Sequence, residues 1–233
     1  MEIQIGVAKI NKYASAESGD TLEVIERPHG GLSVVLADGQ RSGKSAKRIS
    51  TMVVRKVISL LAEGVRDGAA ARAASDYLFT HKSGKVQSTL NIVSLDMESK
   101  TLVITRNNIA PVIISSQGKI SALDGESVSV GIYRDTRPVI TQLDLEENLY
   151  IVVFSDGLPF AGERYSQAIN IESVFKTLID QAKSPQEIAN DLMAEALRLE
   201  KDRPGDDISI LVLGVLPGSE DSVRRMSVRL PLK

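Results

Sequence analysis

The sequence predicts an α+β fold, a four-layer α-β-β-α sandwich in which two central antiparallel β-sheets are flanked by helix pairs. Segments with the two-residue period of strands occur in sequential blocks and do not alternate one by one with helices, which is typical of α+β proteins. Two pairs of amphipathic helices interrupt these blocks, near residues 45–81 and 167–199. The strands Leu149–Phe154 and Ile208–Leu213 are apolar throughout. Such strands are buried on both faces, as the inner layers of a sandwich require.

Length and composition favour one large domain spanning residues 1–233. The chain has 233 residues, of which 42% are hydrophobic and 25% are charged, as in globular proteins. No internal repeat, low-complexity stretch or strong linker divides it. We expect a core over about residues 1–215 and a C-terminal strand and tail over residues 216–233.

Charge and residue usage exclude several classes of function. The formal net charge is −2, so the chain lacks the basic surface that neutralises nucleic-acid phosphates. It contains no cysteine, which excludes disulfides and thiolate metal sites. No apolar run approaches the ~20 residues of a membrane-spanning helix, and the N-terminus has no signal-peptide pattern. We therefore expect a soluble, cytoplasmic protein that binds proteins or small molecules, and neither nucleic acid nor membrane.

The first strands place two aspartates near each other. Ile3, Ile5 and Val7 alternate with polar or small residues, which predicts a strand with one buried face. A β-hairpin follows, with strands at Leu22–Glu26 and Leu32–Ala37 around a turn at residues 28–31. Asp20 precedes the first hairpin strand and Asp38 follows the second. Antiparallel pairing would bring both carboxylates to the same end of the hairpin.

The remaining helices and strands are predicted from apolar periodicity and from capping and turn residues. The expected helices run from Ser45 to Gly64, from Asp67 to His81, from Gln167 to Ala182, and onward from Ser184, where Ser184-Pro185-Gln186-Glu187 forms a capping box. The further expected strands are Thr89–Leu95, Thr101–Thr105, Pro111–Ser115, short pieces around Val128–Val130, and an edge strand at Val223–Leu230.

Four acidic sites lie at strand edges next to glycine, although they are far apart in the sequence. They are Asp20, Asp38 with Gly39, Asp156 with Gly157, and the pair Asp206-Asp207. A single Asp-Gly pair is usually only a turn, but four acidic sites delivered in the same way are less easily explained by chance. Ligand sets made only of oxygen suit Mg²⁺ or Mn²⁺. The pattern therefore predicts a two-metal centre of the kind that activates water for attack on phosphorus.

The segment Gly43-Lys44-Ser45 offers a competing interpretation. It follows the apolar run Val34–Leu36, as the end of a P-loop follows a strand. A P-loop of the form GxxxxGK[ST] requires glycine at the position that Asp38 occupies here. A carboxylate at that position would repel the phosphate that a P-loop binds. A nucleotide-binding P-loop protein is therefore the second hypothesis.

Taken together, these motifs resemble the metal-dependent PPM protein phosphatases of the bacterial stage II sporulation protein E (SpoIIE) type. The resemblance covers about residues 1–215 in the right order, and its carriers are SGD ending at Asp20, ADGQRSGKSA around Asp38, VVFSDGL around Asp156, and GDDISILVLGV around Asp207. The segment Arg106–Pro111 is also similar to a degraded form of a turn in that family. Within the family, the short chain is most similar to stand-alone stressosome feedback phosphatases of the RsbX kind.

The resemblance implies the fold described above and a set of metal ligands. Asp38 would bridge two Mn²⁺ or Mg²⁺ ions, and the carbonyl group of Gly39 would bind one of them. Asp156 and Asp206 would lie on one ion and Asp20 near the other, so Asp38 and Asp20 are the expected catalytic residues. Whether Asp206 or Asp207 is the ligand stays open, and both are candidates.

The resemblance also implies the substrate class and exposes departures from the family. The substrate would be phosphoserine or phosphothreonine on a regulatory protein, such as a phosphorylated stressosome scaffold or an antagonist relative. Arg41 stands where the family often has glycine, and Gln40 stands where eukaryotic relatives have histidine. The phosphate-binding arginine upstream of the first acidic motif is missing. Protonation of the leaving group would then fall to metal-bound water.

Two further expectations concern recognition. Basic residues are not clustered strongly enough to recognise the residues around a phosphorylated side chain in a peptide. Only 4% of residues are aromatic. We therefore expect a folded partner to dock against the metal face. A third hypothesis is a phosphatase fold that binds a phosphorylated partner without cleaving it, although such a binder would not need four uncompensated acidic sites.

Overall fold

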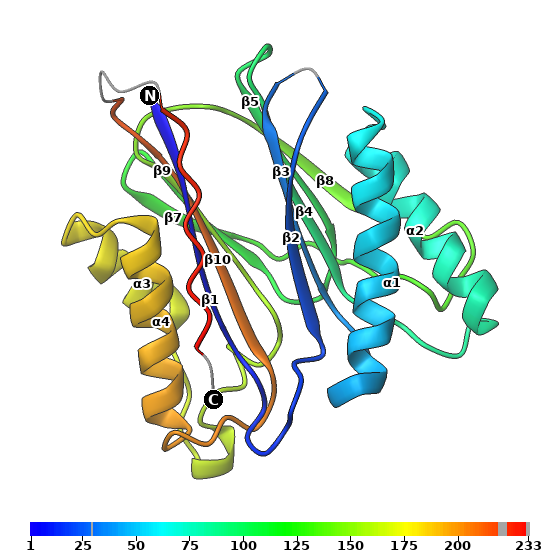
Figure 1. Ribbon diagram of the computed structural model, residues 1–233. Coiled ribbons are helices and arrows are strands. Elements are labelled where there is room, and N and C mark those ends of the chain that lie inside the picture. Colours follow the sequence, from blue (N-terminus) through cyan, green and yellow to red (C-terminus); the bar gives the residue numbers. More distant parts are fainter. Residues whose placement is uncertain (29, 219–222, 232–233) are drawn as a thin grey trace.

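Two antiparallel β-sheets form the centre of the molecule (Figure 1). The computed structural model describes residues 1–28, 30–218 and 223–231. The first sheet has the spatial order β1 (Glu2–Ile10), β10 (Ile208–Leu216), β9 (Leu149–Phe154), β6 (Val112–Ser116) and β7 (Lys119–Leu123). The second sheet has the order β2 (Asp20–Glu26), β3 (Leu32–Asp38), β4 (Leu90–Asp96), β5 (Thr101–Asn107) and β8 (Val139–Asp144).

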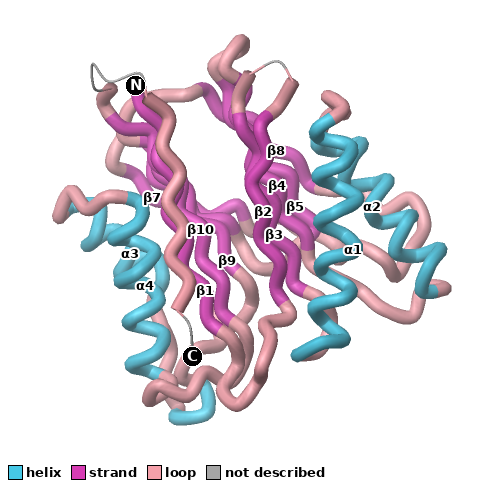
Figure 2. The backbone as a smooth tube through the Cα atoms, in the orientation of Figure 1, coloured by secondary structure: helices cyan, strands magenta, loops and turns pink. Residues whose placement is uncertain are grey.

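Helices cover the outer faces of both sheets, which confirms the predicted fold class (Figure 2). Helices α1 (Gly43–Ala62) and α2 (Asp67–Lys82) pack on the second sheet, and α3 (Ile171–Asp180) and α4 (Pro185–Leu199) pack on the first. A short 3₁₀ helix, η1, spans Glu163–Tyr165. Among the described residues, no helix is long and apolar enough to cross a membrane.

Three apolar layers hold the four structural layers together. Along β9, Ile151 and Val153 are buried between the two sheets, whereas Val152 is buried against α3 and α4. Along β3, Leu36 is buried between the sheets and Val35 faces α1 and α2. Because successive strand residues point to opposite faces, a central strand covered on both sides must be apolar at every position. This burial explains the continuous apolar runs in the sequence.

Several expected boundaries differ from those observed. The third helix begins at Ile171 and not at Gln167, because Asn170 caps it by accepting a hydrogen bond of 2.9 Å from the Ser173 amide. Strands β7 and β8 were not predicted. Both lie at sheet edges, where partial exposure weakens the apolar signal. The expected strand around residues 128–130 contributes only one isolated bridge, between Val130 and Ser88.

The predicted edge strand at Val223–Leu230 is wrong. The described residues of this segment have no strand structure, and its apolar side chains are 60–84% exposed: Val223, Met226, Val228 and Leu230. β1 lies at the edge of the first sheet, yet the described residues of this segment do not pair with it, so alternation alone does not determine backbone pairing. In the turn expected at residues 28–31, His29 lies outside the described residues.

Helix α4 is fixed to the first sheet by a close backbone contact. Its N-terminus has the expected capping box, in which Ser184 and Glu187 bond each other's backbone amides, with Pro185 following the cap. The start of the helix lies against Gly6 of β1 and Gly214 of β10. A Cβ atom at Gly6 would lie 2.3 Å from the carbonyl group of Pro185. The absence of a side chain on β1 therefore permits this approach.

We predict that Gly6→Ala destabilises the fold by about 1–3 kcal/mol, because the added methyl group overpacks the contact with Pro185. The measurement is urea unfolding. Gly125→Ala is the matched control, because a Cβ atom there would approach only the Arg106 side chain, at 3.8 Å. Equal unfolding midpoints for the two variants would contradict the tight packing.

Candidate metal centre

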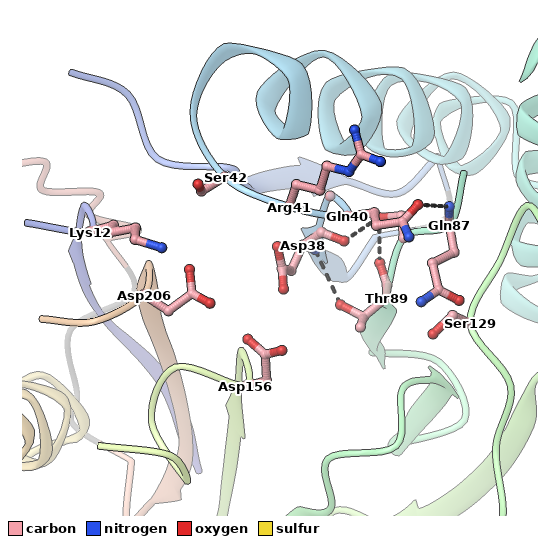
Figure 3. A pocket seen from close by; sticks show the side chains of 12 residues that line it. Lys12, Asp38, Gln40, Arg41, Ser42, Gln87, Thr89, Ser129, Asp156 and Asp206 are labelled. Carbon is pink, nitrogen blue, oxygen red and sulfur yellow. Dashed lines mark hydrogen bonds between the residues drawn. The ribbon is translucent and has the colours of Figure 1, made fainter. Parts of the chain in front are cut away.

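The strand ends bring four aspartates to one edge of the sandwich. Asp20 and Asp38 are direct cross-strand partners at the end of the β2–β3 hairpin, which confirms their predicted proximity. Asp156 follows β9, and Asp206 precedes β10. Because β9 and β10 are antiparallel neighbours, the carboxyl end of one adjoins the amino end of the other. Figure 3 shows Asp38, Asp156 and Asp206 directed toward a common open space.

This space is an open cavity of about 280 Å³. Its lining includes Asp38, Gly39, Asp156 and Asp206, all of which were candidates from the sequence. The other lining residues are polar or basic: Lys12, Gln40, Arg41, Ser42, Gln87, Ser88, Thr89 and Ser129. Asp20 and Asp207 do not line the cavity.

Asp20 lies behind the cavity in a fully buried position. Its Oδ2 atom accepts a hydrogen bond of 2.6 Å from Ser209, whereas its Oδ1 atom is buried and has no hydrogen-bond partner among the described residues. Burial raises the pKa of this carboxyl group. A buried oxygen without a donor is costly, and a nearby cation would satisfy it.

Two lysines compensate part of this negative charge. Lys9 of β1 and Lys47 of α1 donate to the backbone carbonyl of Asp20, at 2.6 Å and 2.7 Å. Burial, together with the charge of Lys47, lowers the pKa of the Lys9 ammonium group. Both lysines bind the main chain of Asp20, so they leave its carboxylate available to another partner.

The cavity carboxylates repel one another. Burial, followed by the charges of Asp20 and Asp156, raises the pKa of Asp38 to about 10. Burial and the charge of Asp206 also raise the pKa of Asp156. Each shift reports that the ionised carboxylate is destabilised in the protein alone. A divalent cation in the cavity would reverse both effects, because it favours the ionised forms.

The structure distinguishes Asp206 from Asp207. Asp206 is exposed on the cavity wall. Asp207 is only 3% exposed, and its two carboxylate oxygens accept hydrogen bonds from the amides of Lys12, at 2.9 Å, and Gly19, at 2.8 Å. Asp207 therefore holds the loop before Asp20, and of the two residues only Asp206 faces the cavity.

The glycines of the two Asp-Gly pairs permit close backbone packing. A Cβ atom at Gly39 would lie 2.0 Å from the Ala46 carbonyl oxygen in the first turns of α1. A Cβ atom at Gly157 would lie 2.2 Å from the Asp207 carbonyl oxygen. A real Cβ atom cannot lie at either distance. Glycine at these two positions therefore permits the start of α1 and the segment at Asp207 to pack closely beside the aspartates.

The donor set fits hard cations with water among their ligands. Within the described part of the chain, no group of three or more acidic, histidine or cysteine side chains lies close enough together to hold a metal ion by itself. The carboxylates instead surround an open cavity. Mg²⁺ is usually bound through one or two carboxylates and keeps several waters. The open arrangement and the unpartnered oxygen of Asp20 are consistent with such ions.

Sequence reasoning missed several residues of the site. Lys12 and Thr89 line the cavity, and Asp38 is fixed by Thr89, whose hydroxyl accepts from the Asp38 amide at 3.2 Å. A lone lysine or threonine in a loop carries no sequence signal, so only the fold could identify them.

The segment Arg106–Pro111 positions a loop near the cavity and supplies none of its lining. The fully buried Arg106 donates to the carbonyl groups of Asn108 and Gly125, and Asn107 donates to that of Val128 at 2.9 Å. These bonds hold the segment that contains Ser129, a cavity residue. The turn that resembled a family motif is thus a support for the site.

The family model for stage II sporulation protein E matches residues 28–216 of the chain. The chain belongs to the SpoIIE family. This is a group of PPM-family, metal-dependent serine/threonine protein phosphatases. The SpoIIE protein of Priestia megaterium is 23% identical over 212 residues, a match that covers 90% of this chain and 36% of that protein. The chain therefore spans about a third of the length of this curated relative.

Solved structures with the same fold include phosphatases. The phosphatase domain of SpoIIE from Bacillus subtilis, with a regulatory fragment, has a TM-score of 0.79 and 19% identity, and the match covers 92% of this chain and 64% of that chain. RsbX in complex with magnesium has a TM-score of 0.71 and 18% identity, with 91% and 94% covered. The catalytic domain of PstP with two manganese ions has a TM-score of 0.68 and 16% identity, with 92% and 99% covered. The likeness confirms the fold.

The P-loop hypothesis does not fit this SpoIIE-family fold. All strand pairings in the described sheets are antiparallel, whereas a P-loop connects a strand of a βα unit to its helix. The residues between β3 and α1 are Gly39–Ser42, a loop too short to curl around phosphate. Lys44 does not line the cavity.

We predict that the metal-free protein loses stability as the pH rises, and that Asp38→Asn reduces this loss. The folded-state pKa of Asp38 is raised from 3.8 to about 10. Between these values the folded protein keeps a proton that the unfolded chain has released, so the free energy of unfolding falls with increasing pH. Urea unfolding in EDTA from pH 5 to pH 9 tests this. Parallel pH dependences of wild type and Asp38→Asn would contradict the assignment.

We also predict opposite consequences for the neighbouring aspartates. Asp206→Asn should weaken the rise in Tm caused by Mn²⁺ without lowering the metal-free Tm, because Asp206 is exposed on the cavity wall and its charge raises the pKa of Asp156. Asp207→Asn should destabilise the metal-free protein by about 1–3 kcal/mol, because one backbone amide loses its acceptor. Thermal unfolding with and without Mn²⁺ separates the two. The reverse pattern would make Asp207 the ligand.

Proposed function

We propose that this chain is a metal-dependent phosphatase that hydrolyses phosphoserine or phosphothreonine on a regulatory protein, with two Mn²⁺ or Mg²⁺ ions. One observation carries the proposal: three carboxylates from different strand ends face one cavity, where burial and neighbouring charges raise the pKa of Asp38 and of Asp156. Asp38 would be shared by the two ions, the carbonyl group of Gly39 would bind one of them, and Asp156 and Asp206 would bind one of them. Asp20 would lie near the other.

When bound, two such ions supply an activated water and positive charge on the phosphoryl group. That similar folds are described with magnesium and with two manganese ions supports the choice of ions. The described residues that line the cavity include no histidine, so the chain offers no imidazole to protonate the leaving group.

The chain's own residues orient the substrate. Lys12 is directed toward the space beside Asp206 in Figure 3 and would bind a phosphoryl oxygen. Its backbone amide is fixed by Asp207, and the amide of Tyr13 donates to the Pro204 carbonyl at 2.9 Å. A lysine anchored on both sides of its peptide unit reaches the cavity from a defined position. Lys12 thus supplies the cation that the missing family arginine would provide.

The partner we propose is a folded phosphoprotein, such as a stressosome scaffold, its antagonist relative, or another protein of a sigma-factor pathway. The cavity is open and its lining is polar, without an apolar groove for peptide side chains. Recognition should therefore come from surfaces outside the phosphorylated residue. A feedback role like that of RsbX belongs to the same proposal.

The test is phosphate release in Mn²⁺ from three substrates: p-nitrophenyl phosphate, short phosphoserine peptides, and the folded phosphoproteins from which the peptides derive. We expect turnover of the small ester and a higher kcat/KM for at least one folded protein than for its peptide. Asp38→Asn should reduce turnover by at least about a hundredfold, because it removes the charge of the bridging ligand.

Lys44→Ala is the matched control, because Lys44 lies outside the cavity and should leave turnover of the small ester unchanged. Wild-type turnover by Asp38→Asn would overturn the two-metal assignment. Peptides cleaved as efficiently as folded proteins would overturn the docking proposal. Binding of phosphoproteins without any phosphate release would favour the non-catalytic alternative.

A further inference from the structure

Arg41 adopts a backbone conformation that L-residues avoid. Its φ angle is +77°, in the left-handed region. Arg41 lies in the four-residue loop between Asp38 and α1 and lines the metal cavity. Glycine would adopt this conformation without strain. The chain therefore has a long cationic side chain at a position whose backbone conformation favours glycine.

Strain of this kind is not confined to the cavity. Among the described residues, ten other non-glycine residues have a positive φ angle: Ala14, Ser83, Lys100, Gln117, Asp135, Asn148, Ser166, Ala182, Lys201 and Asp202. None of these ten lines the cavity. Strained residues beside a reaction site commonly have a functional role. Of these eleven residues only Arg41 lines the cavity, so Arg41 is the candidate for such a role.

The guanidinium group of Arg41 is available to a ligand. The residue is exposed, and no ion pair or hydrogen bond to its side chain occurs among the described residues. Gln40, the preceding residue, is instead tied to Gln87, whose carbonyl accepts from the Gln40 amide at 3.0 Å. The loop is thus anchored beside Arg41 while the side chain of Arg41 stays free.

Its direction separates Arg41 from Lys12, the other cation of the cavity lining. In Figure 3, Lys12 points toward the carboxylates, whereas the side chain of Arg41 extends away from them along α1. A phosphoryl group held between the carboxylates would therefore meet Lys12. Arg41 would meet the part of a bound protein that surrounds the phosphorylated residue.

We propose that Arg41 is a specificity-determining residue that pairs with an acidic side chain flanking the phosphoserine or phosphothreonine of the substrate; the proposal rests on the phosphatase function above. A planar guanidinium group binds a carboxylate through two parallel hydrogen bonds. Arg41 lines the α1 side of the cavity, and its guanidinium group has no partner among the described residues, so it can receive such a carboxylate.

The first measurement concerns the cost of the conformation. Arg41→Gly should raise the Tm of the metal-free protein by about 2–4 °C, because glycine relieves the left-handed strain. Lys100→Gly is the matched control. Lys100 is also an exposed cation with positive φ, +53°, but lies in the turn between β4 and β5. A similar gain in both variants, with a functional loss only in Arg41→Gly, is the expected result.

The second measurement concerns specificity. Two phosphoserine peptides, one with glutamates and one with lysines beside the phosphoserine, are compared by kcat/KM in Mn²⁺. Wild type should prefer the acidic peptide, Arg41→Gly should lose about fivefold or more on it, and Arg41→Glu should prefer the basic peptide. Turnover of p-nitrophenyl phosphate should change less than twofold, because that ester has no flanking residues. Lys100→Glu should behave as wild type.

The outcomes distinguish this inference from the proposed function. Wild type that hydrolyses none of these substrates would overturn the phosphatase proposal and this inference with it. Normal hydrolysis with an unchanged peptide preference in Arg41→Gly and Arg41→Glu would overturn the role of Arg41 alone. An equal loss on the small ester would also overturn it, because Arg41 would then act on the phosphoryl group or on metal binding.

Discussion

Electrostatic repulsion among carboxylates at one edge of the sandwich is the constraint on which the rest of the structure depends. Asp20 and Asp38 are cross-strand partners, and Asp156 lies near enough to raise the pKa of Asp38 further. Like charges at such separations oppose folding unless protons or cations neutralise them. Binding of a cation at this edge of the sandwich would therefore be favourable. That affinity underlies the proposed two-metal chemistry.

The surrounding scaffold opposes this repulsion with rigid, apolar layers. Three layers of buried side chains, one between the sheets and one beneath each helix pair, fix the strands from which the carboxylates project. Lys9 and Lys47 add positive charge at the Asp20 carbonyl without occupying the carboxylate. Ser209 of β10 fixes one oxygen of Asp20 from the other sheet. The site thus joins both sheets, and its geometry depends on their packing.

Loops around the edge divide the remaining tasks. Asp207 fixes the loop before Asp20, and the buried Arg106 fixes the segment that contains Ser129. Two cations then remain at the cavity with different directions, Lys12 toward the carboxylates and Arg41 away from them. Under the proposals above, Lys12 would hold the phosphoryl group and Arg41 would recognise the protein that carries it. Such a role would give a reason for arginine in a conformation that favours glycine.

The sequence by itself determined the fold class, the helix pairs, the core strands and the proximity of Asp20 to Asp38. These features follow from local rules: apolar period, the capping box at Ser184 and the turn chemistry of a hairpin. The edge strands β7 and β8 escaped prediction, because a strand with one partner and an exposed face has a weak pattern. The alternating segment Val223–Leu230 was wrongly predicted to be a strand, because a local pattern does not show whether the backbone pairs with a neighbouring strand.

Only the tertiary structure decided how the acidic residues divide their roles. Asp206 and Asp207 are adjacent and chemically identical, yet the start of β10 turns one toward the cavity and the other toward two backbone amides. The cations could not be identified from the sequence either, because Lys12 and Arg41 line the same cavity only in the folded chain. Sequence patterns report periods along one element. The direction of a side chain at a loop depends on contacts between elements far apart in the chain, and these exist only in the folded molecule.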